Sequence, residues 1–524
     1  MIFRAPEPPL AIPEVALTPF LLQDAERRGD TPALIDAPTG RTLTYRGWAE
    51  AVRRAAASLA QRGLRKGDVF AIYSPNLPEY AVAFHAVSLL GGIVTTISPL
   101  YTADELSRQL KDSSARYLVT TPGFLDKALQ AARENGLREV FVFGEADSVT
   151  SFDSLLAWQG DPPPVTIDPV NDLVVMPYSS GTTGLPKGVM LTHYNLVANI
   201  LQSANVFGIA ERDVVLGVLP FFHIYGMVVV MNLSLHLGAT VVTMPRFELE
   251  ECLRTLEKYR VSYAYIVPPI MLALAKHPSV DKYDLSSIRM LFSGAAPLSP
   301  QIAETAAARL HCGVTQGYGM TEASPVTHST RPGKSVGIGP PIPNTESKIV
   351  AVATGVELGP DEEGEICVRG PQVMKGYLNN PAATAAMIDA DGWLHTGDIG
   401  YADANGCFVV VDRVKELIKY KGLQIAPAEL EAVLLGHPCV ADAAVVPLAD
   451  DEAGQVPKAF VVLRSEVTAD QLMLYVAERV ARYKKLRCIE FTDQIPKSPS
   501  GKILRRVLVE RDRAAGGGQA PRLS

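Results

Sequence analysis

Strand-like runs that alternate with amphipathic helical runs constrain the fold of this chain more than any other feature. The helical runs include RGWAEAVRRAAASLAQRG, which ends at Gly63, a residue type common at helix C-termini. The strand-like runs, spread over some 300 residues, are DVFAIYS (68–74), GIVTTIS (92–98), ARYLVTT (115–121), EVFVFG (139–144), DLVVMPYSS, DVVLGVLP, ATVVTMP, SYAYIVPP and IRMLFSG. Such alternation predicts an α/β fold with layered, mainly parallel sheets.

The pattern changes after this region. From about residue 335 to 411, short strands, turns rich in Gly, Pro and Asp, and few helices predict a small β unit. After VVVDRVKELIKYKG the mixture of helix and strand returns. A chain of 524 residues is expected to form about three or four structural units.

Composition and charge argue against several classes of function. Hydrophobic residues make up 47% of the chain and charged residues 20%, which suffices for a large core. The net charge of −7, with no long basic run, argues against nucleic acid as a partner. The six cysteines are scattered without a CxxC pair, so we expect reduced, buried thiols in a cytoplasmic protein rather than disulfides or a zinc site.

No segment is expected to insert stably into a membrane. The N-terminus lacks an apolar signal core. The most apolar run, GMVVVMNLSLHLG, is short and contains Asn232, Ser234 and His236, which indicates a buried segment. The C-terminal GGGQAPRLS is expected to be a flexible tail and differs from the peroxisomal signal SKL.

The stretch YSSGTTGLPKGVMLTH (178–193) has the composition of a phosphate-binding loop. Glycines let the backbone approach a phosphate, hydroxyls and amides donate hydrogen bonds, and Lys187 adds a positive charge. It is not a Walker loop, because Lys187 follows Pro186 and precedes Gly188. A strand-like run precedes it and the helical run YNLVANILQSANVFG follows it, so we predict a loop between a strand and a helix.

This stretch resembles the phosphate-loop signature of the adenylate-forming superfamily, which includes acyl-CoA synthetases, 4-coumarate–CoA ligases, beetle luciferases and peptide-synthetase adenylation domains. Further stretches agree in the family's order, over nearly the whole chain: QGYGMTEASPV (316–326), DGWLHTGD (391–398), DRVKELIKYKGLQIAP (412–427) and PKSPSGKILRR (496–506). The runs FFHIYGM, SGAAPL and KYKGLQIAPAELE resemble the 4-coumarate–CoA ligase branch. The resemblance implies an AMP-forming acid–thiol ligase, which converts a carboxylate, ATP and CoA to acyl-CoA, AMP and pyrophosphate through an acyl-adenylate.

The resemblance also implies an architecture in two parts. A large N-terminal domain is expected over residues 1–411, with the β subdomain at about 335–411. A hinge at 412–415, with Lys415 at the family's hinge position, would lead to a small mobile α+β domain over 416–524. Rotation of this domain would separate adenylation, which must exclude water, from thioester formation, which must admit CoA.

Residues for the nucleotide and its metal ion follow from the same motifs. Because negative charge gathers on the phosphoryl oxygens, cations and N–H donors are needed around them. The β- and γ-phosphates are expected at Ser179, Ser180, Gly181, Thr182, Thr183 and Lys187. The resemblance places the adenine at Gln316, Gly317 and Tyr318, the α-phosphate at Thr321, the ribose at Asp398 and Arg413, and Mg²⁺ at Glu322.

Further residues match positions that act on the acyl group and CoA. Lys502 matches the family's catalytic lysine, whose charge bridges the carboxylate and ATP and serves mainly adenylation. Its PxxxxGK setting suggests the hypothesis that acylation silences it. His223 is expected to position the acyl carbonyl and thiol. Lys419 and Gln424 are expected near the adenylate, and Arg246, Lys421 and Gly422 near CoA.

The acyl group is expected in an apolar pocket with a phenol in its wall. The residues implied are Ile224, Tyr225, Tyr265, Phe292, Gly294, Ala295, Gly317, Pro325 and Val326. Such a pocket suits a flat aromatic or a medium aliphatic acid. Plant 4-coumarate–CoA ligases usually have Lys at the position of Phe292, near the phenolic end of the substrate. The change favours cinnamate-like or aliphatic acids, so 4-coumarate/cinnamate-type acids and medium- or long-chain fatty acids both stay open.

Other functions fit the sequence less well. The tail argues against a luciferase-type oxygenase, and the missing GKS or GKT argues against a P-loop NTPase. Retention of Lys187, Glu322, Asp398 and Lys502 argues against an inactive binding protein. A peptide-synthetase module is not expected, because the chain ends about twenty residues after Lys502. A monomer or homodimer is expected.

Overall fold

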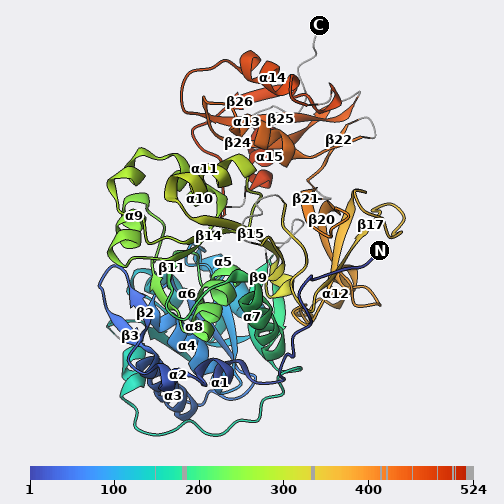
Figure 1. Ribbon diagram of the computed structural model, residues 1–524. Coiled ribbons are helices and arrows are strands. Elements are labelled where there is room, and N and C mark those ends of the chain that lie inside the picture. The colour runs from blue at the N-terminus through green and yellow to red at the C-terminus, as the bar shows by residue number, and fades with distance from the viewer. Residues whose placement is uncertain are drawn as a thin grey trace.

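The structure of the chain is a computed structural model. It describes residues 1–147, 149–179, 186–331, 337–413, 416–420, 423–450, 453–480, 482–498, 501 and 503–514. The strands of these residues form four sheets, two in the bulk of the N-terminal part, one beside them and one in the C-terminal part (Figure 1).

Two large sheets form the bulk of the N-terminal part. The first runs in the order β19 (Gly376–Tyr377), β10 (Lys187–Thr192), β9 (Leu173–Ser179), β5 (Ile93–Ile97), β4 (Val69–Tyr73), β6 (Ala115–Thr120), β7 (Glu139–Val142) and β8 (Thr150–Ser151). The second runs β16 (Val326–Ser329), β15 (Gly313–Gly319), β14 (Met290–Ser293), β13 (Tyr263–Ile266), β11 (Val214–Gly217), β12 (Thr240–Thr243), β2 (Pro32–Asp36) and β3 (Thr42–Thr44). In both, the central strands are parallel, as the alternating pattern predicts. Antiparallel strands lie at the β19 edge of the first sheet and at both edges of the second, whereas β8, at the other edge of the first sheet, is parallel to β7.

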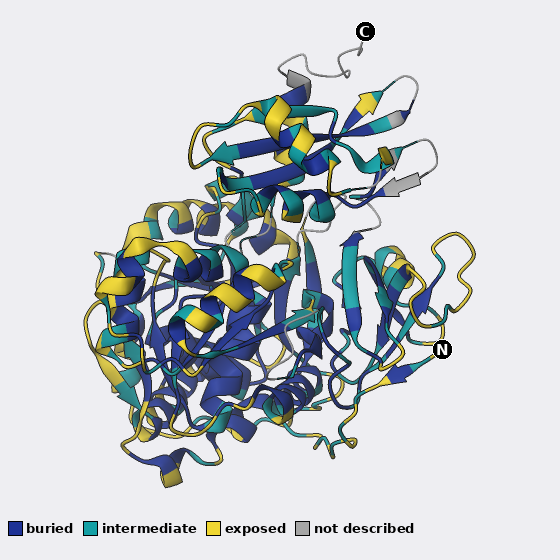
Figure 2. Cartoon of the chain, turned by 45° about the horizontal axis from the view of Figure 1, so that its top comes forward, coloured by how far each residue is buried: buried dark blue, intermediate teal, exposed yellow. Residues whose placement is uncertain are grey.

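A buried layer of helices joins the two sheets into one core. Helix α4 (Pro78–Leu89) is buried along almost its whole length, which is typical of a helix enclosed by protein. Side chains of both sheets, such as Ile72 and Val215, belong to the same buried cluster as α4. The other helices of this part are α1 (Leu17–Leu22), α2 (Ala25–Arg28), α3 (Tyr45–Gln61), α5 (Ala103–Asp112), α6 (Leu125–Asn135), α7 (His193–Phe207), α8 (Ser234–Leu237), α9 (Leu249–Lys258), α10 (Pro268–Lys276) and α11 (Pro300–Leu310). Figure 2 shows buried strands inside and exposed faces on the outer helices.

The predicted buried segment 226–238 adopts an unusual helix. Residues Tyr225–Leu233 form the π-helix η3, and α8 follows it. Every residue of η3 is buried, in agreement with the sequence interpretation. Within the described residues, no helix has the length and apolar character needed to cross a membrane. The described residues also form short 3₁₀-helices: η1 (Pro122–Phe124), η2 (Phe152–Ala157), η4 (Pro278–Lys282), η5 (Thr321–Ala323) and η6 (Arg482–Lys484).

The small β unit is an antiparallel sheet beside the two large ones. Its strands run in the order β1 (Phe3–Arg4), β17 (Glu346–Val350), β18 (Gly364–Arg369), β20 (Leu394–Ala402) and β21 (Phe408–Arg413). Helix α12 (Pro381–Met387) lies between β19 and β20 in the sequence. The edge strand β1 comes from the N-terminus, which the local pattern of residues 335–411 could not indicate.

The C-terminal part is a separate α+β unit. Its sheet runs β23 (Leu423–Ile425), β22 (Ile418–Tyr420), β25 (Gly454–Leu463) and β24 (Val440–Asp450), with β26 (Cys488–Phe491) paired to β25. Helices α13 (Pro427–Leu435), α14 (Ala469–Ala477) and α15 (Arg505–Ala514) pack with it. The predicted fold class, a large layered α/β domain with a β subdomain and a small α+β domain, is confirmed.

Two sequence predictions need correction. Residues 187–192 are not part of a loop between a strand and a helix: they form β10, antiparallel to β9, with Lys187 opposite Ser179. Alternate residues Val189 and Leu191 are buried in the core, which favours a strand, and α7 begins only after Thr192. The six cysteines are unpaired as predicted, but only Cys252 and Cys367 are buried.

Candidate active site

Residues from segments far apart in the sequence meet at the carboxylate of Glu322. Helix η5, which carries Glu322, follows directly on β15. The Oε1 atom of Glu322 accepts a hydrogen bond from Ser179 Oγ at 2.8 Å and another from Tyr377 OH at 2.7 Å. Lys187 Nζ lies 5.2 Å from the centre of the Tyr377 ring. The predicted metal ligand therefore lies beside both described ends of the predicted phosphate loop.

Tyr377 is a residue of this site that the sequence interpretation missed. Burial, together with the charge of Glu322, raises the pKa of its phenol well above the usual value. The phenol stays protonated and can donate its hydrogen to the carboxylate. Tyr377 reaches Glu322 because β19 pairs with β10, with Tyr377 opposite Val189. A two-residue strand leaves no periodic signal in the sequence.

A second group of predicted residues meets where β15 faces the β subdomain. Tyr318 OH donates a hydrogen bond to Asp398 Oδ2 at 2.5 Å. Asp398 is buried on β20, where its backbone pairs with that of Arg413 on β21. Gln316 is buried on β15, and its backbone N–H donates to Thr330 Oγ1 at 2.8 Å. The residues predicted for adenine and ribose thus lie on neighbouring surfaces.

His223 and Thr321 line one small cavity. The cavity holds about 50 Å³ and is also lined by Ile224 and Tyr178. Its other lining residues are Thr96, Ser98, Tyr101, Gln109, Pro177 and Phe222. The Nδ1 atom of His223 accepts a hydrogen bond from the Tyr225 N–H at 3.2 Å, which requires a ring without a proton on Nδ1. The predicted α-phosphate residue and the predicted acyl-positioning residue therefore face the same space.

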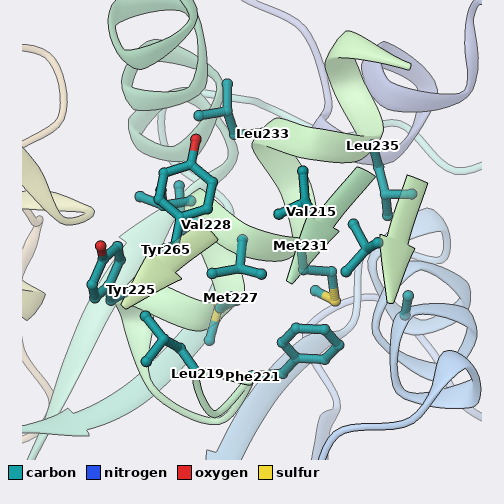
Figure 3. Close-up of a cluster of buried hydrophobic side chains, with 14 of the residues drawn as sticks. Val215, Leu219, Phe221, Tyr225, Met227, Val228, Met231, Leu233, Leu235 and Tyr265 are labelled. Carbon is teal, nitrogen blue, oxygen red and sulfur yellow. The ribbon is translucent and has the colours of Figure 1, made fainter. Parts of the chain in front are cut away.

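The predicted acyl residues form an aromatic cluster. The ring of Phe292 lies 5.5 Å from that of Tyr265 and 6.4 Å from that of Tyr225, measured between centroids. Phe207, which the sequence interpretation did not single out, lies closer to Phe292, at 4.3 Å. Figure 3 shows Tyr225 and Tyr265 beside side chains of η3, among them Val228. These rings form an apolar wall.

At two predicted glycines, the absence of a side chain leaves space for the aromatic rings. A Cβ atom at Gly317 would overlap the ring of Phe292, and one at Gly294 would meet the Tyr225 ring at 3.1 Å. Tyr225 OH donates to the Phe292 carbonyl at 3.3 Å. The remaining predicted acyl residues are placed nearby along the chain: Ala295 follows Gly294 with a φ of 70°, and Pro325 and Val326 lie where β16 begins.

Several predicted site residues lie outside the described residues, and others are described only in part. Ser180, Gly181, Thr182, Thr183, Lys415, Lys421, Gly422 and Lys502 lie outside the described residues. For Arg413, Lys419 and Gln424 the structure gives the strands but not the side chains, and Lys419 pairs with Gln424 across β22 and β23. Arg246 is exposed after β12.

Gly501, the described residue before Lys502, lies close to the N-terminal part. A Cβ atom at Gly501 would lie 3.3 Å from Val267 and 3.4 Å from Pro269. Val267 follows β13, which carries Tyr265, and Pro269 lies in the first turn of α10. The residue immediately before Lys502 therefore contacts the part that holds the aromatic cluster.

Comparison with known proteins places the chain in a family. Residues 21–378 match the AMP-binding enzyme family, and residues 429–502 match the AMP-binding enzyme C-terminal domain. The chain is 46% identical to 4-coumarate–CoA ligase 5 of Oryza sativa subsp. japonica, over 97% of this chain and 96% of that protein. It is 43% identical to 4-coumarate–CoA ligase 2 of Petroselinum crispum, over the same shares of the two chains.

Solved structures agree with this placement. An anthranilate CoA ligase in complex with anthranoyl-AMP superposes with a TM-score of 0.89, at 26% identity, over 97% of this chain and 99% of that chain. The chain belongs to the AMP-binding enzyme family. Within it, the chain belongs to the family of 4-coumarate–CoA ligases, so the predicted enzyme class, an AMP-forming acid–thiol ligase, is confirmed.

Proposed function

We propose that the protein joins a cinnamate-type carboxylic acid to CoA, with ATP as the source of free energy. The observation that carries the proposal is the buried Glu322 carboxylate, which accepts hydrogen bonds from Ser179 and Tyr377, with Lys187 beside the Tyr377 ring. Relatives over nearly the whole chain are named 4-coumarate–CoA ligases, which supports both the reaction and the class of acid.

The residues around Glu322 fit Mg²⁺ and the phosphates of ATP. Mg²⁺ prefers oxygen ligands and commonly takes one or two carboxylates together with substrate phosphates. Glu322 would supply the carboxylate, and Ser179 and Lys187, with Ser180, Gly181, Thr182 and Thr183, would hold the β- and γ-phosphates. When bound, the metal ion supplies positive charge against the phosphates. Ser179 and Tyr377 fix the orientation of the Glu322 carboxylate.

Adenylation would proceed between the two groups of residues described above. Asp398 and Arg413 would hold the ribose, and Gln316, Gly317 and Tyr318 the adenine. A carboxylate oxygen of the acid attacks the α-phosphorus, and pyrophosphate leaves. Thr321 would donate to the α-phosphate, and Lys502 would offset the charge as the two anions meet. The contact of Gly501 with Val267 and Pro269 supports this role, because it brings the Lys502 segment to the N-terminal part.

Thioester formation would follow on the same adenylate. The thiol of CoA attacks the acyl carbonyl, and AMP leaves. His223 would position the carbonyl and the thiol, and Lys419 and Gln424 would lie near the adenylate. We propose that residues 416–524 turn about a hinge at 412–415, with Lys415 in it, so that Arg246, Lys421 and Gly422 bind CoA.

The aromatic cluster supports an aromatic acid without a ring hydroxyl. Phe292 packs between Phe207 and Tyr265 and against Gly317, so this wall offers a ring face rather than an ammonium group. A flat apolar ring stacks well on such a wall. A hydroxylated ring would lose a hydrogen bond to water there, which disfavours it by roughly 1–3 kcal/mol. We also propose that the protein acts in the cytoplasm, which its unpaired cysteines support.

The test is a panel of acids incubated with Mg·ATP, with and without CoA. Cinnamate, 4-coumarate, octanoate and palmitate are compared for pyrophosphate release and for thioester formation. We expect thioester from both aromatic acids, with cinnamate preferred. Thioester from the fatty acids alone would move the function to a fatty-acyl-CoA synthetase. Pyrophosphate without thioester from every acid would refute the CoA half of the proposal.

A further inference from the structure

One guanidinium binds three separate segments of the C-terminal part. Arg505 Nη2 donates to both carboxylate oxygens of Glu431, at 2.9 and 2.8 Å, and Nη1 donates to Glu416 Oε2. Arg505 Nε donates to the carbonyl of Val445 at 3.2 Å. The side chains of Arg505 and Glu431 are 14% and 9% exposed, so the group is largely shielded from water. All three nitrogen atoms of the guanidinium therefore donate hydrogen bonds within this network.

The segments that Arg505 connects have distinct positions in the fold. Glu416 is the first described residue after the proposed hinge. Glu431 lies on α13, and its Oε1 atom also accepts the Val445 N–H of β24 at 2.7 Å. Arg505 begins α15, three residues after Lys502. A single side chain thus connects the exit of the hinge, the domain core and the segment of Lys502.

The described neighbours of Lys502 are tied into the same unit. Leu504 N–H donates to the Pro496 carbonyl at 2.9 Å, and Ile503 forms a bridge with Lys497. Lys497 Nζ in turn pairs with Asp442 Oδ2 of β24 at 2.6 Å. The hydrogen bond from Arg505 to Glu416 reaches the described residue next to the hinge.

Breaking such a network is costly because charge would remain buried. Two carboxylates share one guanidinium, and the planar fork of arginine suits this bidentate geometry, whereas a lysine ammonium can reach only one point. Removal of one partner leaves an unpaired charge in a shielded place. The segment of Lys502 would then lose its fixed relation to Glu416.

We propose that Arg505 is a positioning residue for adenylation, which locks the Lys502 segment to Glu416 so that both turn as one body about the hinge. The inference rests on the proposed function, in which Lys502 serves adenylation. A displacement of about 1 Å at a reacting group can lower a rate about a hundredfold. Adenylation therefore depends on Arg505 more than thioester formation does.

The test measures the two half-reactions separately in the full-length protein. Pyrophosphate release from acid and Mg·ATP reports adenylation, and thioester formation from synthetic cinnamoyl-adenylate and CoA reports the second step. For Arg505→Lys we expect a loss of about 10- to 100-fold in adenylation and less than about threefold in thioester formation. Glu416→Gln, which removes the charge of the acceptor on the hinge side and keeps Glu431, should show the same split.

The neighbouring Arg506 provides the matched control. Its side chain is 78% exposed and, among the described residues, forms an ion pair with Glu510 of its own helix at 3.4 Å, so Arg506→Lys should leave both steps unchanged. Thermal unfolding of each variant shows whether it is folded. Equal losses in both steps would overturn the inference, and so would the absence of any loss in both Arg505→Lys and Glu416→Gln. Either result would leave the proposed function standing. Absence of pyrophosphate release by the unmodified protein with every acid would overturn the proposed function and the inference with it.

Discussion

Tyr377 donates its phenolic hydrogen to Oε1 of Glu322 at 2.7 Å, and this bond links a two-residue edge strand to the centre of the proposed nucleotide site. Ser179 donates to the same oxygen from the strand that precedes the phosphate loop. The orientation of the Glu322 carboxylate is therefore set by two elements that are far apart in the sequence.

Replacement of Tyr377 by Phe should weaken binding of Mg·ATP. The change removes one donor from a charged, buried acceptor, which costs roughly 1–2 kcal/mol. We expect the KM for Mg·ATP in pyrophosphate release to rise about tenfold. Tyr283→Phe is the matched control, because Tyr283 OH donates to Glu250 at the same distance of 2.7 Å on α9. An equal effect of both variants would contradict the role given to Tyr377.

Replacement of Asp398 by Asn should weaken nucleotide binding while the fold is kept. The neutral amide loses the charge-assisted acceptance of the ribose hydroxyls and of Tyr318 OH. We expect the KM for ATP to rise by at least about tenfold, with the KM for the acid nearly unchanged. Asp403→Asn alters a turn of the same sheet, where Asp403 accepts the Asn405 N–H at 2.9 Å, and should leave both constants unchanged. A normal KM for ATP in Asp398→Asn would rule out the ribose assignment.

Replacement of Gly317 by Ala should block the acyl site through Phe292. The new methyl group would overlap the Phe292 ring, which is confined by Phe207 and Tyr265. Overpacking of this kind costs about 1–3 kcal/mol, so kcat/KM for cinnamate should fall at least about tenfold. Adding Phe292→Leu should restore part of the loss, because the smaller side chain leaves room for the methyl group. If the loss of kcat/KM in the double variant equals the product of the losses in the two single variants, the two residues do not act on one pocket.

Acid should destabilise the folded protein through its buried histidines. Burial lowers the pKa of His85 and of His328 to about 3, and that of His193 to about 4, against an ordinary value of 6.5. Between these values the unfolded chain binds protons that the folded chain does not, so stability is kept above about pH 6.5 and lost as the pH falls towards 4. Measurement of the unfolding free energy against pH should show this fall.

A single variant tests the contribution of His85. His85 bonds Thr18 Oγ1 and Asn232 Oδ1, both at 2.9 Å, in the core. His85→Asn should remove about one proton from the pH dependence, which is about 1.4 kcal/mol per pH unit in the acid range. An unchanged slope in His85→Asn would show that His85 is already charged in the folded state.

Sequence patterns predicted the layered fold for a physical reason, and the candidate site residues followed from motifs that resemble a known family. The parallel strands are short apolar runs between amphipathic helices, and the nucleotide residues stand in contiguous motifs, so both signals are local. β10 was missed because the phosphate-loop composition masked the alternation of Val189 and Leu191. Loop composition and strand periodicity can compete in the same short stretch.

Contacts between distant segments could not be read from the sequence. Tyr377 meets Glu322 through the pairing of β19 with β10, and Phe207, the last residue of α7, resembles any core residue. Arg505 meets Glu416 across 89 positions, and nothing in either local pattern marks the pair. Such contacts depend on how the sheets are joined, which local periodicity does not encode.

The most direct test of the central claim follows an oxygen atom. Cinnamate labelled with ¹⁸O in its carboxylate is incubated with the protein, Mg·ATP and CoA, and AMP and pyrophosphate are analysed by mass spectrometry. Attack of the carboxylate on the α-phosphorus, followed by thioester formation, places one ¹⁸O in AMP and none in pyrophosphate. We expect this labelling together with the formation of cinnamoyl-CoA. Unlabelled AMP, or ¹⁸O in inorganic phosphate with ADP as the nucleotide product, would contradict it.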